Sequence, residues 1–188
     1  NSPVTVNIAI PTVTYFDGAA VQTISAIGTA TSSSHYIVGS KPALTVDSVQ
    51  KTGLVLGAEN KIGEVTVSAD AAGQIVLTTI TFSTSTSGIT SPTFTGTRIA
   101  DGNTTIPGSS CAGLGVCTMG SYAIAAGTSK TFSLFSTVGG TPIASTQVAV
   151  NSSVTAAGFV WTDSLGGGTG ITGANIYNFP TASYSVRQ

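Results

Sequence analysis

Large apolar residues alternate with polar or small residues close to the start of this sequence. Val4, Val6, Ile8 and Ile10 are each separated from the next by a single threonine, asparagine or alanine. A period of two is typical of a β-strand, because successive side chains of a strand point to opposite faces. Pro11 follows the run and cannot donate a backbone hydrogen bond, so we expect it to end the strand. The pattern therefore predicts an N-terminal strand with four β-branched residues on one face.

Short runs of β-branched and aromatic residues recur along the rest of the chain, and no stretch keeps helical spacing beyond a turn. The alternation changes phase between Leu77 and Ile80, which indicates a β-bulge or a strand that changes sheets. Residues 101–120 are predicted as a long loop. Many short strands without helices predict an all-β chain folded as a β-sandwich. The further predicted strands cover residues 21–27, 36–38, 43–49, 62–67, 75–82, 132–135, 147–150 and 159–161. Residues 88–97 are predicted as a turn with a short strand, and residues 176–186 as a C-terminal extended segment.

The composition is poor in charge and rich in hydroxyl groups. Only 7% of the 188 residues are charged and the net charge is −1, whereas an ordinary globular chain has about 25% charged residues. The six basic residues are scattered, so we expect no binding to nucleic acid. Threonine and serine number 31 and 24, which is 55 of 188 positions. Two interpretations remain open: a secreted domain that resists heat or chemical denaturation, or a surface that contacts other subunits without burying charges.

The two cysteines indicate an oxidising compartment. Cys111 and Cys117 enclose a glycine-rich segment, and a metal site lacks ligands because His35 is the only histidine. We therefore predict a disulfide, which in a ring this short contributes about 2 kcal/mol. The sequence has no signal peptide and no apolar run of membrane-spanning length. Because the chain starts at Asn1 rather than methionine, we expect a mature, secreted product at the cell surface that does not insert into a membrane.

Four stretches resemble a known kind of domain. They are residues 40–47, 64–82, 124–134 and 159–163, and together they resemble immunoglobulin-like (Ig-like) modules in surface proteins of candidate-phyla, small-genome bacteria. The resemblance covers roughly residues 40–188 and implies a secreted Ig-like β-sandwich on a cell envelope, without catalytic residues. Residues 1–38 lie outside it. We therefore predict an N-terminal strand or arm over 1–38 and an Ig-like domain over 39–188.

Candidate catalytic and ligand-binding residues are sparse. His35 follows a serine run and is expected to be structural or solvated, so a Ser–His–acid triad has no base. Asp70, Asp101 and Asp163 fall in turn-like settings, where aspartate bonds to its own backbone. Calcium at such turns stays an alternative, but no Asp-x-Asp spacing supports it. The segment 166–170 is glycine-rich but lacks the lysine of a phosphate-binding loop. We predict a protein that is not an enzyme and has no cofactor.

Surface recognition has its own candidates. Trp161 and the five tyrosines could form a platform for sugars, although Trp161 within Phe-Val-Trp fits a sandwich core better. Asn103 and Asn151 each begin an N-x-Thr/Ser sequon, and both are read as lying in loops. They are glycan acceptors only where the host has the glycosylation machinery.

The N-terminal strand gives the most specific hypothesis. The strand that carries Val4, Val6, Ile8 and Ile10 can complete its own sandwich, or it can be donated into the sheet of a neighbouring subunit. Head-to-tail donation is a heterologous contact and produces an open homopolymer. We therefore predict a structural subunit of an extracellular filament (a pilus-like thread) or surface array. The alternative is an adhesin or carbohydrate-binding module that contacts a host or neighbouring cell surface.

Overall fold

The computed structural model describes the backbone of residues 3–4, 7–16, 19–31, 35–36, 38–112, 115–163 and 171–188. Side chains are described for residues 19–23 and for the described residues from 38 onward. The chain divides into two compact units, Asn1–Val38 and Gly39–Gln188. The first is called the arm below and the second the sandwich.

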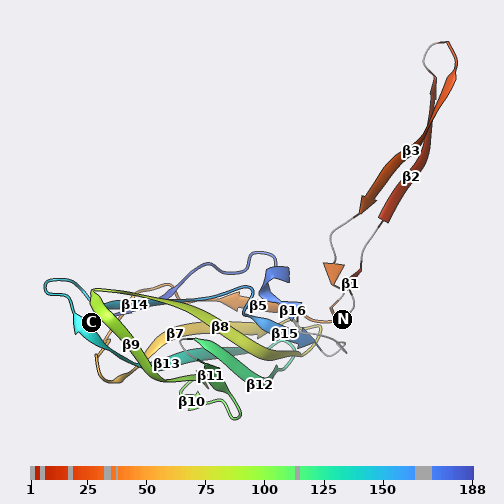
Figure 1. Ribbon diagram of the computed structural model, residues 1–188. Helices are drawn as coiled ribbons and strands as arrows, with labels where there is room; N and C mark the ends of the chain where they lie inside the picture. Colours follow the sequence, from red (N-terminus) through yellow and green to blue (C-terminus); the bar gives the residue numbers. More distant parts are fainter. Residues whose placement is uncertain are drawn as a thin grey trace. The chain divides into compact units, whose positions relative to one another are not determined.

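The arm contains a long antiparallel hairpin (Figure 1). Its strands are β2 (Asn7–Phe16) and β3 (Val21–Thr31), which form a two-stranded sheet. A second short pair joins β1 (Pro3–Val4) to β4 (His35–Tyr36). The arm of the described chain is therefore made of strands alone.

The prediction that Pro11 ends the first strand is wrong. β2 continues through Pro11 to Phe16, and the register with β3 shifts between Ile10 and Thr12. Ile10 pairs with Gly28 and Thr12 pairs with Ser25, so two residues of β3 lie opposite Pro11. Such a β-bulge is one of the few places where a sheet accepts a proline, because no ladder hydrogen bond is required there.

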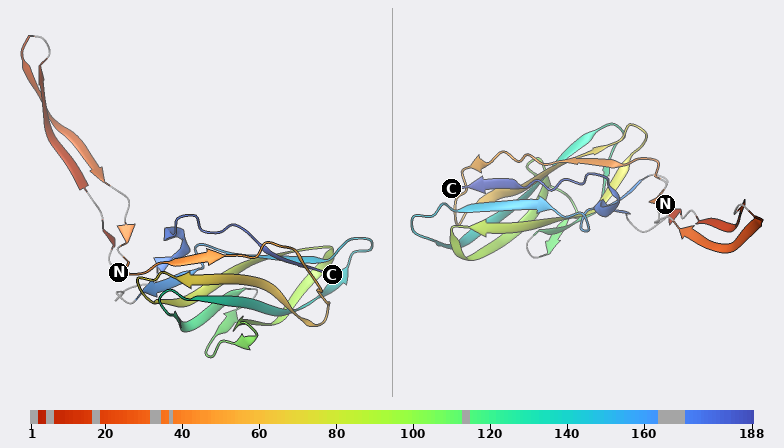
Figure 2. Two further views of the ribbon diagram at one scale, coloured as in Figure 1. Left: turned by 180° about the vertical axis from the view of Figure 1, so that it is seen from behind. Right: turned by 90° about the horizontal axis from the view of Figure 1, so that it is seen from above.

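The sandwich consists of two sheets that lie face to face (Figure 2), which confirms the predicted fold class. One sheet has five strands in the order β10-β9-β13-β7-β5, and the other has the order β11-β12-β8-β14-β17-β6, with β15 pairing with β8 and β16. The first sheet comprises β5 (Pro42–Thr45), β7 (Glu59–Ala69), β9 (Ile89–Asp101), β10 (Thr104–Thr105) and β13 (Ser129–Pro142). The second comprises β6 (Lys51–Thr52), β8 (Ile75–Ser87), β11 (Ser110–Ala112), β12 (Val116–Ile124), β14 (Ala149–Val154), β15 (Val160–Asp163), β16 (Ile171–Thr172) and β17 (Tyr184–Arg187).

The strand order is Ig-like. In one sheet β5, β7, β13 and β9 take the places of strands A, B, E and D, and in the other β17, β14 and β8 take those of G, F and C. The short strand β6 pairs in parallel with β17. Strands β10, β11 and β12 form an insertion between D and E. The chain enters the sandwich at one end, where β5 lies, and the C-terminus lies at the other end (Figure 1).

The core lies between the two sheets and is built from alternate residues of their central strands. Val65 and Val67 of β7 and Phe132 and Leu134 of β13 are completely buried. Gly63 shows how closely the sheets approach, because an added Cβ would lie 3.1 Å from the Phe82 ring of the opposite sheet. Apolar burial of this kind supplies most of the stability of such a domain.

The predicted phase change in the 75–82 strand is confirmed. Leu77 pairs with Trp161 and Thr79 pairs with Val160, so Thr78 is the extra residue of a bulge in β8. The bulge lets Leu77 and Ile80 both be buried. Beyond it, β8 changes its neighbour from β15 to β14.

Two other expectations are wrong. The region 101–120 is not a long loop: it holds β10, β11 and the start of β12. The strand expected over 43–49 ends at Thr45, because the Asp47 carboxylate accepts a hydrogen bond from the Val49 backbone N–H at 3.0 Å and forms a local turn instead.

Candidate functional site

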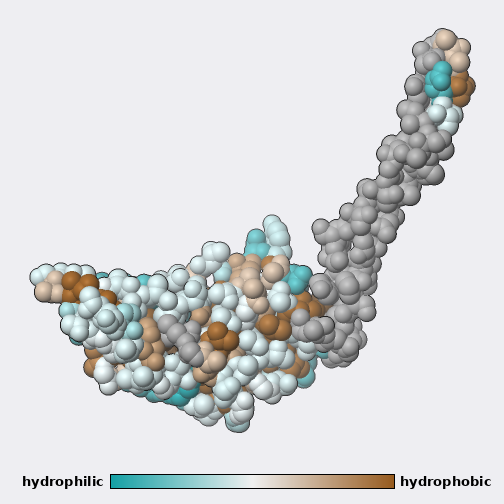
Figure 3. All heavy atoms as spheres, viewed as in Figure 1, coloured by the Kyte–Doolittle hydropathy of each residue, from teal (hydrophilic) through white to brown (hydrophobic). Residues whose placement is uncertain are grey.

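The exposed tip of the arm, residues 19–23, is the part of the hairpin whose side chains are described. Ala19, Ala20, Val21, Gln22 and Thr23 are all exposed, and Val21 retains 68% of its accessible surface. Figure 3 shows hydrophobic atoms at this tip, whereas the visible face of the sandwich is mostly of intermediate hydropathy. An exposed tip that combines the apolar Val21 with the polar Gln22 and Thr23, on a long hairpin, is a candidate contact surface.

The predicted donor-strand residues are divided between two elements. Val4 lies in β1, and Ile8 and Ile10 lie in β2, so they do not belong to one strand. Val6 and the side chains of all four predicted residues lie outside the described part of the structure. Their role as an interface stays a prediction.

The arm lacks the charges that usually protect strand edges. Residues 1–38 include Asp17 and His35 as their only titratable side chains other than tyrosine, and neither β2 nor β3 contains a charged residue. Each strand of the hairpin has one neighbour in the described two-stranded sheet. Natural proteins usually blunt such edges with lysine, proline or bulges. Here Pro11 and its bulge interrupt only the middle of the hairpin.

The edge of the sandwich formed by β9 is protected. β9 shifts register against β13 at two places, between Arg98 and Thr95 and between Thr93 and Thr90. Ser91 and Gly96 have left-handed backbone angles, with φ of 48° and 62°, and Pro92 lies beside Ser91. Bulges and proline prevent a further strand from pairing along this edge.

The opposite edge of this sheet carries charge. β5 pairs with β7 only from Thr66 to Ala69. The part of β7 without a β5 partner carries the half-buried Lys61 and Glu64, whose Nζ and Oε2 atoms are 2.6 Å apart. The Lys61 ammonium also lies 5.7 Å from the centre of the Tyr184 ring. Charged side chains on an edge strand disfavour pairing with another chain.

Asp101 at the end of β9 binds one residue of the neighbouring strand β13 and one of β12 in the opposite sheet. The Tyr122 hydroxyl donates to Asp101 at 2.7 Å and the Lys130 ammonium donates to the same oxygen at 2.8 Å. Lys130, and then Tyr122, hold the pKa of Asp101 below its usual value, while Asp101 raises the pKa of Lys130. Burial, and then Asp101, raise the pKa of Tyr122. Asp101 therefore links the end of β9 to β12 and β13 through its carboxylate, and does not form the local turn that we expected.

We predict that the stability of the protein is nearly independent of pH between about pH 5 and pH 9. The lowered pKa of Asp101 means that its stabilising effect is present above its usual value of 3.8 and is lost as pH falls further. The raised pKa of Lys130 means that its stabilising effect is lost only above its usual value of 10.5. Melting temperatures measured across this range should form a plateau with a fall below about pH 4. A steep change near pH 6 would contradict this account.

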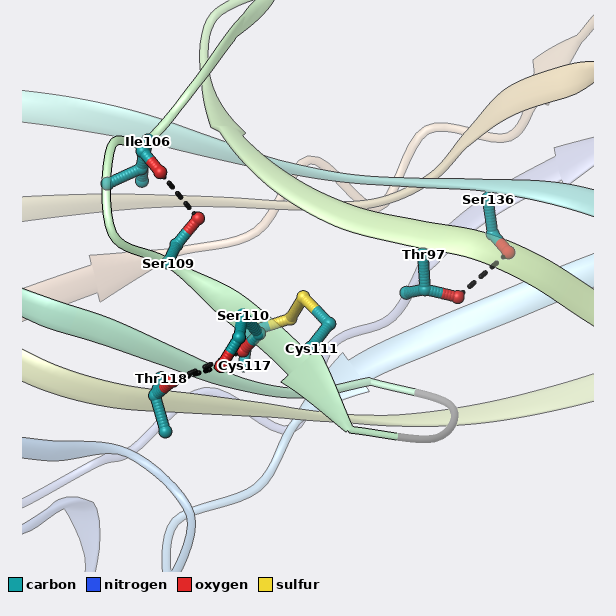
Figure 4. The surroundings of a disulfide bond; sticks show 8 residues. All are labelled: Thr97, Ile106, Ser109, Ser110, Cys111, Cys117, Thr118 and Ser136. Carbon is teal, nitrogen blue, oxygen red and sulfur yellow. Dashed lines mark hydrogen bonds between the residues drawn. A yellow bond between two sulfur atoms is a disulfide. The ribbon is translucent and has the colours of Figure 1, made fainter.

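The predicted disulfide is present. Cys111 of β11 and Cys117 of β12 are direct cross-strand partners with Cα atoms 4.1 Å apart. Figure 4 shows the bond beside Ser110 and Thr118, whose side-chain oxygens are 2.9 Å apart. Cys117 is buried and also pairs with Ile80 of β8. The disulfide therefore links the two strands of the inserted hairpin, and the pairing of β12 with β8 joins that hairpin to the second sheet.

Removing this disulfide should cost about 2 kcal/mol of stability, because it closes a short loop. The test is thermal unfolding of C111S/C117S against the native chain, each with and without dithiothreitol. We expect the double variant and the reduced native chain to melt at the same lower temperature. Equal melting of the oxidised and reduced native chain would show that the bond contributes nothing.

The acidic residues have structural partners. The Asp70 carboxylate accepts from the Ala72 N–H at 2.9 Å, which confirms its predicted turn. Asp163, expected in a turn, ends β15 instead and is 4% exposed. It accepts hydrogen bonds from the backbone N–H groups of Gly39 and Ser40. Among the described residues, no group of three or more histidine, cysteine, aspartate or glutamate side chains could hold a metal ion.

The sequence carries a signal for the buried position of Asp163 that contradicts the predicted turn. Asp163 follows Trp161 at a spacing of two, and Trp161 was assigned to the core. Period two places both residues on the buried face of one strand. His35 lies in β4, and its side chain and residues 166–170 lie outside the described part of the chain.

The aromatic residues divide between core and surface. Trp161 is 2% exposed, which confirms its predicted place in the core and removes it from any sugar platform. Its Nε1 atom has no hydrogen-bond partner in the structure as described. Tyr184 is also buried, and Tyr122 is held by Asp101, whereas Tyr177 is 90% exposed. Tyr177 is thus the fully exposed tyrosine of the described chain.

The two sequons differ in accessibility. Asn103 lies in the exposed turn between β9 and β10, as expected. Asn151 does not lie in a loop: it is half-buried in β14, where it pairs with Ser85 of β8 and Ser185 of β17. Geometry therefore favours Asn103 as a glycan acceptor.

In the described ranges, no helix is long and apolar enough to cross a membrane. The sequence matches no protein-family model, and a search of curated proteins finds no significant match.

Proposed function

We propose that this chain is a structural subunit of an extracellular filament or surface array, and that its N-terminal arm joins a neighbouring subunit by strand pairing. The observation that carries the proposal is the β2–β3 hairpin, with strands of 10 and 11 residues that form a two-stranded sheet. An isolated two-stranded hairpin is marginally stable in water, and further strands stabilise it. Pairing with a neighbour supplies those strands.

The sandwich has properties that suit a polymer. It is charge-poor, so close contact between copies buries few charges. Its N-terminal entry and its C-terminus lie at opposite ends (Figure 1), which suits head-to-tail contacts that leave an open polymer. The disulfide is compatible with secretion into an oxidising compartment. The resemblance to Ig-like surface modules implies the same location.

An adhesin or carbohydrate-binding module is the second candidate. Tyr177 favours it, because an exposed aromatic ring offers an apolar face to a sugar. Trp161 gives it no support, because its indole is buried. A glycan array probed with the native chain and with Tyr177→Ala tests this candidate.

The arm is tested by placing charges on it in the full-length chain. Val21→Lys combined with Thr23→Lys adds two positive charges to β3, where lysine should prevent strand pairing. Ala71→Lys combined with Gln74→Lys adds the same charge to exposed positions between β7 and β8. Sedimentation velocity should show large assemblies for the native chain and the control, and monomers for the arm variant. Assembly of the arm variant, or a native chain that stays monomeric, would overturn the proposal.

A further inference from the structure

We infer that the partner of the arm is the arm of a second copy, and that the hairpins of successive copies pair edge to edge, β3 of one with β2 of the next. This inference rests on the proposed function and names its contact. It differs from donation of a strand into the neighbour's sandwich, which the sequence suggested.

Three of the partly uncovered strands of the sandwich, β9, β7 and β12, are poor acceptors. The β9 edge is interrupted by Pro92 and by the left-handed residues Ser91 and Gly96. The β7 edge carries the Lys61–Glu64 ion pair. β12 shifts register between Thr118 and Tyr122. Each feature is a recognised defence against an added strand.

The outer half of the hairpin lacks such defences. From Thr12 to Phe16 and from Val21 to Ser25 the strands pair without a register shift, and they contain no proline, glycine or charged residue. Segments with high β-propensity and no charge are the ones that add strands from other chains. The bulge opposite Pro11 ends this regular stretch at Thr12.

The two strands also complement each other. Within one hairpin, Phe16 pairs with Val21, Thr14 with Thr23, and Val13 with Ile24. Pairs of aromatic with β-branched residues and of threonine with threonine stabilise neighbouring strands. The same pairs form between copies when β3 of one hairpin lies beside β2 of the next in the same register.

Repetition of this contact produces an open polymer and not a closed dimer. Hairpins that repeat along the ribbon with the usual twist of a sheet place an ascending β2 next to a descending β3, so every pair in the ribbon is antiparallel. The contact joins two different edges and is therefore heterologous, which extends into a polymer. Each copy adds two strands, or about 9–10 Å of ribbon at the usual strand spacing.

The test mixes two single-cysteine variants of the full-length chain, Thr14→Cys and Thr23→Cys, under oxidised glutathione. The native cysteines are already joined to each other. We expect a disulfide-linked dimer several-fold more abundant in the mixture than in either variant alone. Val13→Cys with Ile24→Cys is the second pair, and it covers the case in which the first pair does not assemble. Ser83→Cys, exposed on the sandwich, is the control partner for Thr23→Cys and should give no dimer.

Each other outcome has a defined meaning. Assemblies that form normally but yield no dimer with either cysteine pair overturn the arm-to-arm contact and leave the proposed function intact. A dimer of Thr23→Cys with itself that exceeds the mixed dimer also overturns it, because this product requires a two-fold contact between β3 strands. A native chain that never assembles overturns the proposed function as well.

Discussion

Replacing Phe132 with alanine is expected to lower the free energy of unfolding by about 3–5 kcal/mol. Phe132 is completely buried in β13, the strand with neighbours on both sides at the centre of its sheet. Its ring meets Tyr122 edge to face, with centroids 5.2 Å apart. The substitution removes this packing and leaves a cavity between the sheets. Urea denaturation measures the loss, which is a large fraction of the total for a domain with a typical stability of about 5–15 kcal/mol.

Phe135→Ala is the matched control. Phe135 belongs to the same strand but is only half-buried, and it contacts the Arg98 guanidinium at 4.3 Å from the ring centre. Arg98 in turn donates two hydrogen bonds of 2.8 Å to Glu59. Loss of a half-buried ring should cost clearly less than loss of Phe132. If both variants lost the same free energy of unfolding, the assignment of the core to the face of β13 that carries Phe132 would be contradicted.

Asp163→Ala is expected to lower the free energy of unfolding by about 2–4 kcal/mol, because two backbone N–H groups would lose their hydrogen-bond acceptor at a buried place. Asp163 holds the backbone of Gly39 and Ser40 against the end of β15, and its distance to the Ser40 N–H is 3.4 Å. Ser40 itself is buried, so water cannot easily replace the carboxylate. The measurement is again the urea midpoint of the full-length chain.

Asp163→Asn is the control for this test, because asparagine has nearly the same side-chain volume as aspartate. The amide keeps an oxygen that can accept from the same backbone, so it should retain much of the stability that alanine loses. Hydrogen exchange at the Gly39 and Ser40 amides should rise strongly in the alanine variant and weakly in the asparagine variant. Unchanged exchange in both would show that Asp163 does not hold this segment.

Much of the fold could be predicted from alternation. Ile62, Val65 and Val67 indicated β7, and the phase change between Leu77 and Ile80 indicated the bulge that the structure contains. These signals are reliable because burial between two sheets enforces a period of two. The lengths of strands were harder to predict, because local hydrogen bonds such as that of Asp47 compete with pairing.

The candidate site was less accessible to sequence reasoning. A proline within a run of strand residues normally ends the strand. Only the register of β2 with β3 shows that a β-bulge accommodates Pro11. The cysteine region looked like a loop because β10 and β11 are only two and three residues long and glycines lie between the strands. Cross-strand pairing of Cys111 with Cys117 depends on tertiary contacts with β8 that alternation does not encode. Edge protection by Lys61 and Glu64 likewise becomes visible only once β7 is known to be partly uncovered.

Self-association through the arm is the central claim, and electron microscopy of the full-length native chain in negative stain tests it most directly. We predict threads or ordered arrays at high protein concentration, and single particles for the Val21→Lys, Thr23→Lys variant. Native chains that remain isolated particles at the highest soluble concentration would contradict the claim.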